Sequence, residues 1–277
     1  CNVIDKPPAV RMLCWLICFD IIPGDRIKWM RSIMDLIRRY HRLASHHLAE
    51  FYNDPPNAIL RMPQSIVRTA VDEAMPRFEQ LADELLIPRE KRGDAKLIIE
   101  RIIAIAINDI PSFMFAPYHV HLVIASVLLP LALQTLGNLN NIFTETIGYY
   151  LTLKFLGMAG FNKDLKDKEM DTGYREDLVK LMEIEALDSL YALHEANMTL
   201  TAKVELWDEL FFTDFHHADD MYLILDQIIY HRDEFRKYFR CLIVAHFHQA
   251  ELMHADVTRD DLGMEGRWCV PELVIDT

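Results

Sequence analysis

The side chains best suited to chemistry include an acid and a histidine near the C-terminal end of the sequence. Glu251 and His254 stand three residues apart. This spacing puts both side chains on one face of a helix and is typical of di-iron carboxylate sites in helical bundles. Such a site needs a second copy of the motif and two further inward glutamates, and the sequence contains no second copy. We therefore predict surface residues here and no bound metal.

A second group of potential ligands is His216-His217-Ala218-Asp219-Asp220. Adjacent residues of a helix face different directions, so this run is a poor metal cage, and we predict that it caps a helix beginning near Met221. Spaced aspartates also hold magnesium against a diphosphate in helical prenyl-diphosphate enzymes, but Leu223 occupies the position of the next aspartate. No phosphate loop, nucleophile elbow or Rossmann fingerprint is present. The sequence predicts no cofactor.

Composition sets the class of protein that must position these side chains. The 277 residues are 51% hydrophobic and carry a net charge of −13, which favours a globular chain and excludes a nucleic-acid-binding surface as the main function. The five cysteines form no C-x-x-C pair, which fits a reducing compartment and neither a disulfide framework nor a zinc knuckle. The first residue is Cys and no signal sequence follows it, so we expect a cytoplasmic domain cut from a longer chain.

Apolar residues recur at spacings of three and four, and only nine glycines interrupt them, so the pattern predicts an all-α fold. The longest apolar run, Leu122 to Leu133, contains Pro130 and is shorter than the roughly 20 residues that span a bilayer. We predict a buried helix there and no transmembrane segment. The first expected helix begins at Pro8 and is stopped by Pro23-Gly24, and a second follows to about Phe51. The next helix begins at Ser65 and is broken at Pro76. Further helices are expected over 95–108, 118–136, 143–156, 176–196, 202–212, 221–230 and 234–254, with Asp94, Thr201 and Asp233 as N-caps.

A break at Gly137-Asn138 and Asn140-Asn141 divides the sequence into two halves. We expect two lobes, with residues 1–136 forming the N-terminal one and residues 137–277 the C-terminal one. Trp207, Phe211, Phe212 and Phe215 stand at helical spacing in the second half, where such a group is typical of a core rather than of an interface.

Several scattered islands resemble the TBC family of Rab GTPase-activating proteins. The family's R-x-x-x-W pattern is present as Arg11 to Trp15, and its I-x-x-D-x-x-R-T island aligns with residues 62–69. The buried helix that precedes the family's Y-x-Q-G aligns with residues 99–111, and that tetrapeptide aligns with residues 115–118. The C-terminal lobe supplies Trp207, Phe211 and the pair Leu225-Asp226. The resemblance covers about Pro8 to His254 and implies an all-α, two-lobed, V-shaped domain.

The resemblance also implies a mechanism. In this family an arginine neutralises the charge that develops on the GTP phosphate, and a glutamine positions the attacking water. The arginine position is Arg68, but Ser65 replaces the aspartate three residues earlier, so we expect no carboxylate to orient the guanidinium. Pro117 replaces the glutamine and has no side-chain donor or acceptor. Gln64 and His119 lack the spacing to substitute for it, and we expect both to be loop or surface residues.

These residues predict a TBC-like binding module that engages a GTP-bound Rab-type GTPase, or scaffolds a trafficking or signalling complex, with weak or absent activating power. Partner contacts are expected at Thr69, Phe115 and Tyr118, and membrane recruitment is expected through partners. One alternative is a working GTPase activator that uses Arg68 as an arginine finger and the GTPase's own glutamine. Another is a helical metalloprotein. The simplest alternative is that Arg68 is a solvated surface residue and belongs to no functional site.

Overall fold

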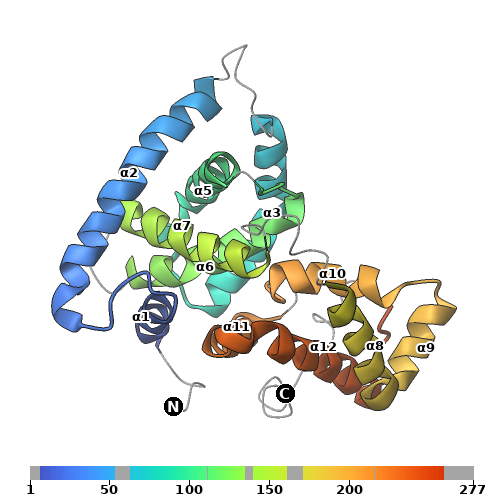
Figure 1. Ribbon diagram of the computed structural model, residues 1–277. Helices are drawn as coiled ribbons and strands as arrows, with labels where there is room; N and C mark the ends of the chain where they lie inside the picture. The colour runs from blue at the N-terminus through green and yellow to red at the C-terminus, as the bar shows by residue number, and fades with distance from the viewer. Residues whose placement is uncertain are drawn as a thin grey trace. The chain divides into compact units, whose positions relative to one another are not determined.

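The described part of the chain folds into helices (Figure 1). The structure is a computed structural model and describes residues 7–53, 63–110, 112–134, 140–160, 171–214 and 216–258. Within these ranges every regular element is an α-helix or a 3-10 helix, and none is a strand. The prediction of an all-α protein is confirmed.

The helices form two compact units, Cys1–Asn162 and Lys163–Thr277. Helix α7 (Asn141–Met158) packs along α6 (Val120–Gln134), so the helix that follows the expected break belongs to the first unit. The boundary predicted between residues 136 and 137 therefore lies inside that unit. Residues 135–139, where the break was placed, lie outside the described residues.

Helix α5 (Ala95–Asp109) is the centre of the first unit. It contacts α2 and α3 as well as α6 and α7, and ten of its fifteen residues are buried, as the apolar stretch from residue 95 predicts. Asp94 stands at the N-cap position, without a side-chain capping bond. The remaining helices of this unit are α1 (Pro8–Cys18), η1 (Arg26–Lys28), α2 (Trp29–Asn53), α3 (Gln64–Glu84), α4 (Arg89–Arg92) and η2 (Pro117–His119).

Helix α6 is apolar around its whole circumference and is covered by its neighbours α1, α3, α5 and α7. The segment Pro117–Gln134 is long and apolar enough to cross a membrane by composition, and 78% of it is buried inside the protein. The close fit of α7 against α6 depends on Gly148. A Cβ atom there would lie 2.9 Å from Cγ2 of Val127, too close for a real contact.

Helix α3 runs through Pro76, so the break predicted at this residue is wrong. Proline removes one backbone hydrogen bond. The buried stripe continues on both sides of Pro76, from Val71 and Ala74 to Phe78 and Leu81. Packing of this stripe holds the helix together, because tertiary contacts contribute more to helix stability than intrinsic propensity.

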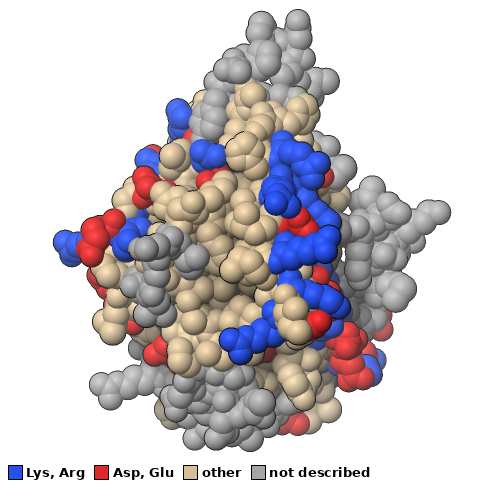
Figure 2. Space-filling view, turned by 90° about the vertical axis from the view of Figure 1, so that its left-hand side faces the viewer, with Lys and Arg blue, Asp and Glu red and all other residues tan. Residues whose placement is uncertain are grey.

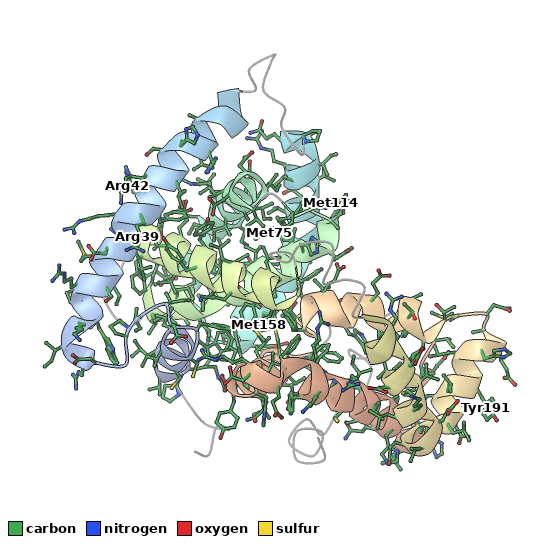
Figure 3. All side chains as sticks on the ribbon, in the orientation of Figure 1. Arg39, Arg42, Met75, Met114, Met158 and Tyr191 are labelled. Carbon is green, nitrogen blue, oxygen red and sulfur yellow. The ribbon has the colours of Figure 1, made fainter. Side chains whose placement is uncertain are left out.

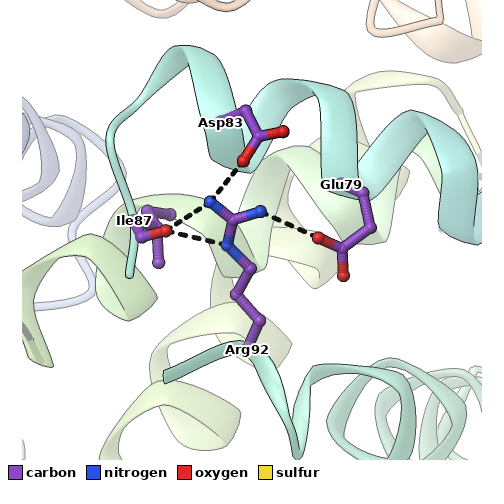
Figure 4. Close-up of polar contacts among 4 residues, drawn as sticks. All are labelled: Glu79, Asp83, Ile87 and Arg92. Carbon is purple, nitrogen blue, oxygen red and sulfur yellow. Dashed lines mark hydrogen bonds and ion pairs between the residues drawn. The ribbon is translucent and has the colours of Figure 1, made fainter. Parts of the chain in front are cut away.

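The short helix α4 is fixed to α3 by Arg92 (Figure 4). Its guanidinium Nε donates to the carbonyl oxygen of Ile87 at 2.8 Å, while the terminal nitrogens bind Glu79 at 2.8 Å and Asp83 at 2.7 Å. The ion pairs tie the turn between the two helices to the last turns of α3.

Helix α12 (Phe235–Leu252) is the centre of the second unit and contacts the four other α-helices there. Trp207, Phe211 and Phe212 are buried, so the predicted aromatic core is confirmed for these three, and Phe215 lies outside the described residues. Among the described residues, the other helices of this unit are α8 (Asp171–Glu185), α9 (Leu187–Glu195), α10 (Leu200–Leu210), α11 (Ala218–Tyr230) and η4 (Arg232–Glu234).

Three local predictions for the second unit were wrong. The single helix expected over 176–196 is two helices, because the chain turns at Ala186, whose φ is −149°. The N-cap of α10 is Thr199, not Thr201, and its hydroxyl accepts from the backbone N–H of Ala202 at 3.2 Å. Asp233 lies inside η4 and does not cap α12.

Candidate functional site

Arg68 projects from the beginning of α3, and its side chain is 51% exposed. The Nε group donates to Oε1 of Glu100 on α5 at 2.9 Å, and the Glu100 side chain is only 6% exposed. A planar guanidinium hydrogen-bonded to a fixed carboxylate is restricted in orientation. Arg68 is therefore an oriented and half-exposed cation, not a solvated surface residue.

Glu100 corrects the expectation that Arg68 has no orienting carboxylate. Ser65 cannot supply one, but Glu100, 32 residues later, does. A sequence signal for this role was available. Glu100 is the one acidic residue in the apolar stretch 95–108, and a buried carboxylate needs a partner.

Ser65 and Thr69 are exposed on the same helix as Arg68. Residues four apart on an α-helix share a face, and Arg68 is adjacent to it. The structure therefore brings these three residues of the second TBC-like island together on one solvent-exposed side of α3. Val67, in the same segment, is fully buried and fixes the helix to the core.

The third island forms the short turn η2. Pro117 is exposed and Tyr118 half-buried, so both are accessible. Phe115, predicted to contact a partner, is buried and packs edge-on against Phe113, with ring centroids 6.4 Å apart. His119, expected on the surface, is also buried, and its Nδ1 accepts from the backbone N–H of Ala116 at 2.9 Å. These two rings anchor the turn instead of offering surface.

Turn η2 contacts α3. His121, at the start of α6, lies near Arg77. Burial, with the positive charge of Arg77 as a second cause, lowers the pKa of His121 to about 4. Arg77 follows Arg68 by nine residues, about 13.5 Å along a helix. The beginning of α6, which follows the proline turn, therefore lies near a part of α3 that is well separated from Arg68 along the helix.

A second polar cluster, which no local sequence pattern predicts, lies inside the first unit. Glu145 on α7 accepts from Nε of Arg101 at 2.8 Å and from the hydroxyl of Tyr40, which is fully buried on α2. Burial raises the pKa of Glu145, although both hydrogen bonds and the charge of Arg101 oppose the shift. Burial and the nearby carboxylate raise the pKa of Tyr40 well above its ordinary value. The cluster joins α2, α5 and α7 across the core, which is a structural role.

The histidine-rich segment of the second unit contains a buried histidine pair. Nε2 of His216 lies 2.8 Å from Nε2 of His246, and both rings are buried. Nδ1 of His246 lies 2.7 Å from the carbonyl oxygen of Leu242, so it must donate, and His246 Nε2 then accepts from His216. Burial lowers the pKa of His246 to about 4. The expected helix start is confirmed within three residues, since α11 begins at Ala218 with Asp219 and Asp220 in its first turn.

The E-x-x-H motif does not present both side chains on one helix face. Helix α12 ends at Leu252, and His254 has a φ of 52°, in the left-handed region. Glu251 accepts instead from the backbone N–H of Ser189 at 2.5 Å, near the start of α9. Across the described part of the chain, no three His, Cys, Asp or Glu side chains gather closely enough to hold a metal ion.

The sequence matches no family model, no curated protein and no solved structure. The resemblance to the TBC family accordingly rests on the chain's own residues and their order.

Proposed function

We propose that this chain is a TBC-like, two-lobed helical domain that binds a GTP-loaded Rab-type GTPase and accelerates hydrolysis weakly or not at all. The observation that carries the proposal is Arg68, half-exposed on α3 and oriented by the buried carboxylate of Glu100. Ser65 and Thr69 flank it on the exposed side of the helix. In the cell, such a domain would work in the cytoplasm within a trafficking or signalling complex.

The Arg68 site fits binding better than catalysis. Arginine is enriched at the energetic centres of protein interfaces, because its planar group makes several hydrogen bonds at once. An activating arginine must place its charge on the phosphate oxygens in the transition state, and here Glu100 already neutralises part of that charge. Moving Arg68 onto a phosphate would leave Glu100 buried without this partner, which carries a free-energy cost.

Pro117 supports low activating power. It is the first residue of η2, exposed, and its ring has no group that could hold the attacking water. His119, which stands nearby, is buried and already accepts a backbone hydrogen bond. Neither side chain takes over the role of the missing glutamine, so the water would depend on the GTPase alone.

A panel of Rab-type GTPases tests the proposal. Each is loaded with GDP or a non-hydrolysable GTP analogue and titrated with the purified chain. We expect at least one partner that prefers the GTP state, and we expect Arg68→Ala to weaken that binding about tenfold. Arg89→Ala, at an exposed site on α4, is the matched control and should leave the affinity unchanged. Absence of GTP-dependent binding across a complete panel would reject the proposal.

A second candidate is a working activator that uses Arg68 as its finger. The exposure of Arg68 favours it, because a guanidinium at the surface of α3 can be reached by a bound phosphate. Single-turnover hydrolysis separates the two. An acceleration of about 10³-fold or more that Arg68→Ala abolishes would establish the activator. Acceleration that survives the substitution would show that Arg68 has no catalytic part.

A further inference from the structure

Helix α2 and the turn η1 before it carry a positive surface on a chain whose net charge is −13. Residues 26–42 contain six Lys or Arg and one aspartate, a formal charge of +5. All six basic residues are exposed. The space-filling view shows Lys and Arg side chains gathered in a stripe over the side of the molecule formed by α2 (Figure 2).

The stripe follows from the periodicity of α2. Arg31, Arg38 and Arg42 are spaced by seven and four residues, so they share one face. Leu36 and Tyr40 point into the core from the opposite side. Arg39 widens the stripe and, in Figure 3, lies about one turn from Arg42 along the helix.

Carboxylates neutralise only part of this surface. Asp35 pairs with Arg38 at 2.9 Å, and Asp25 pairs with Lys28 at 3.4 Å. Among the residues that the structure describes, no ion pair engages Arg31, Arg39 or Arg42. These three cations are therefore available to an anionic partner.

Large apolar side chains lie beside the basic ones. Ile27 is 91% exposed and Met30 72% exposed, and Met34 follows one turn later on the outer side of α2. Soluble proteins seldom leave such residues in a row in water. Ile27, Met30 and Met34 stand at spacings of three and four, so they form a ridge along the flank of the arginine stripe. This ridge and the six basic residues of 26–42 are called the α2 face below.

We propose that the α2 face binds the surface of an anionic phospholipid membrane directly. Basic residues gain affinity near acidic headgroups, and exposed apolar side chains enter the boundary between headgroups and acyl chains. An acidic protein segment would satisfy the arginines but would leave the Ile27, Met30 and Met34 ridge in water. An anionic membrane surface would bind the arginines and also remove the apolar ridge from water. The inference does not depend on the proposed GTPase, whose site is on α3.

Vesicle co-sedimentation of the purified chain tests the membrane proposal. Vesicles of phosphatidylcholine alone are compared with vesicles that also contain about 30% phosphatidylserine, at low salt. We expect binding to the anionic vesicles only, and we expect it to fall steeply near 0.5 M salt, where the screening length is below about 5 Å. Equal binding to both vesicle types, or none to either, would overturn the proposal.

Two variants locate the binding surface. Because each basic residue at an anionic surface contributes about a fivefold factor, the triple variant Arg31→Gln/Arg39→Gln/Arg42→Gln should bind about 100-fold more weakly. The control Arg89→Gln/Lys91→Gln/Lys96→Gln makes the same charge change at exposed sites elsewhere in the first unit and should bind within about threefold of the wild type. Equal losses in the two variants would mean that net charge, not the α2 face, drives binding.

The apolar ridge separates a membrane from an acidic protein. Met30→Ser/Met34→Ser leaves every charge in place and should weaken vesicle binding about tenfold, whereas Leu86→Ser/Leu97→Ser, at exposed sites off this face, should not. Circular dichroism confirms that each variant is folded. A soluble polyglutamate peptide that binds the chain and is insensitive to the methionine change, while vesicles fail to bind, would assign the surface to an acidic protein and overturn the proposal.

Discussion

Arg68 and Arg92 are both paired with carboxylates around α3, and their burial is opposite. The Arg92 side chain is 7% exposed, and its partners Glu79 and Asp83 are at the surface (Figure 4). At Arg68 the guanidinium is the exposed member, and Glu100 is buried. The carboxylates therefore face the solvent at Arg92, whereas the guanidinium faces the solvent at Arg68.

This difference separates a structural arginine from one that can serve a ligand. Arg92 satisfies a backbone carbonyl, and leaving that position would strand the carbonyl of Ile87 in the interior. Arg68 has about half of its side chain in water, so an anionic partner can reach it from the solvent. Arg101 is intermediate, since it is one-third exposed and its partner Glu145 is buried.

The largest effect is expected at Arg92. Replacing Arg92 with alanine removes a charge-assisted donor from the Ile87 carbonyl and should lower the free energy of unfolding by about 2–3 kcal/mol. Chemical denaturation measures the change. Arg89→Ala on the same short helix is exposed and should change stability by less than about 0.5 kcal/mol. If both variants lost the same stability, burial would not distinguish structural arginines in this fold.

A smaller loss is expected at Arg101. Methionine at this position keeps the apolar stem but removes the donor to Glu145, which is then left with Tyr40. Because about one-third of Arg101 is exposed and solvent screens its charge, Arg101→Met should cost about 1–2 kcal/mol in the same denaturation experiment. Arg39→Met, at an exposed site on α2, is the control. A loss larger than that of Arg92→Ala would reverse the ranking by burial.

The helical class and most helix positions could be predicted from local patterns. The stretch from Ala95 became α5 with nearly the expected ends, because its apolar positions cover the whole circumference and allow only a core helix. The break predicted at Pro76 is wrong, because the buried stripe that keeps α3 intact depends on contacts with helices distant in sequence. Ala186 ends a helix without any glycine or proline that could have signalled it.

The candidate site was predictable only in part. The position of Arg68 on an exposed helix start followed from the islands near residue 65, but its partner Glu100 is 32 residues away. Pairings across such distances depend on which helices become neighbours, and no local pattern fixes that. The burial of Phe115 and His119 was missed for the same reason. A glutamate alone in an apolar helix was the one usable signal.

The pH dependence of stability sharpens the comparison of buried carboxylates. Burial raises the pKa of Glu145 above its ordinary 4.5, so the folded state holds the proton more tightly than the unfolded state. Stability from this group therefore falls as the pH rises from 4.5 toward the folded pKa. We expect Glu145→Gln to remove that slope in denaturation series collected from pH 4 upward.

Asp177 in the second unit provides the opposite sign. The hydrogen bond from Arg240 lowers the pKa of Asp177 below 3.8, so its stabilisation is present above pH 3.8 and is lost as the pH falls through the folded pKa. Asp177→Asn should reduce the dependence of stability on pH only below about pH 3.8.

For Glu145→Gln, an unchanged dependence of stability on pH above 4.5 would show that another group causes that slope.

The smallest effect is expected in the coupling between Arg68 and Glu100. A double-mutant cycle with Arg68→Ala and Glu100→Gln isolates the pair from the rest of the helix. Arg68 is 51% exposed, so solvent screens the attraction, and the coupling free energy should be below about 1 kcal/mol. The cycle of Arg92→Ala with Glu79→Gln is the matched comparison at an arginine that is buried. A coupling above about 2 kcal/mol at Arg68 would mean that its guanidinium is held as firmly as that of Arg92. Such an arginine could not turn to a GTPase without losing more free energy than one interface contact returns, and the binding role assigned to it would fail even though the hydrogen bond to Glu100 is real.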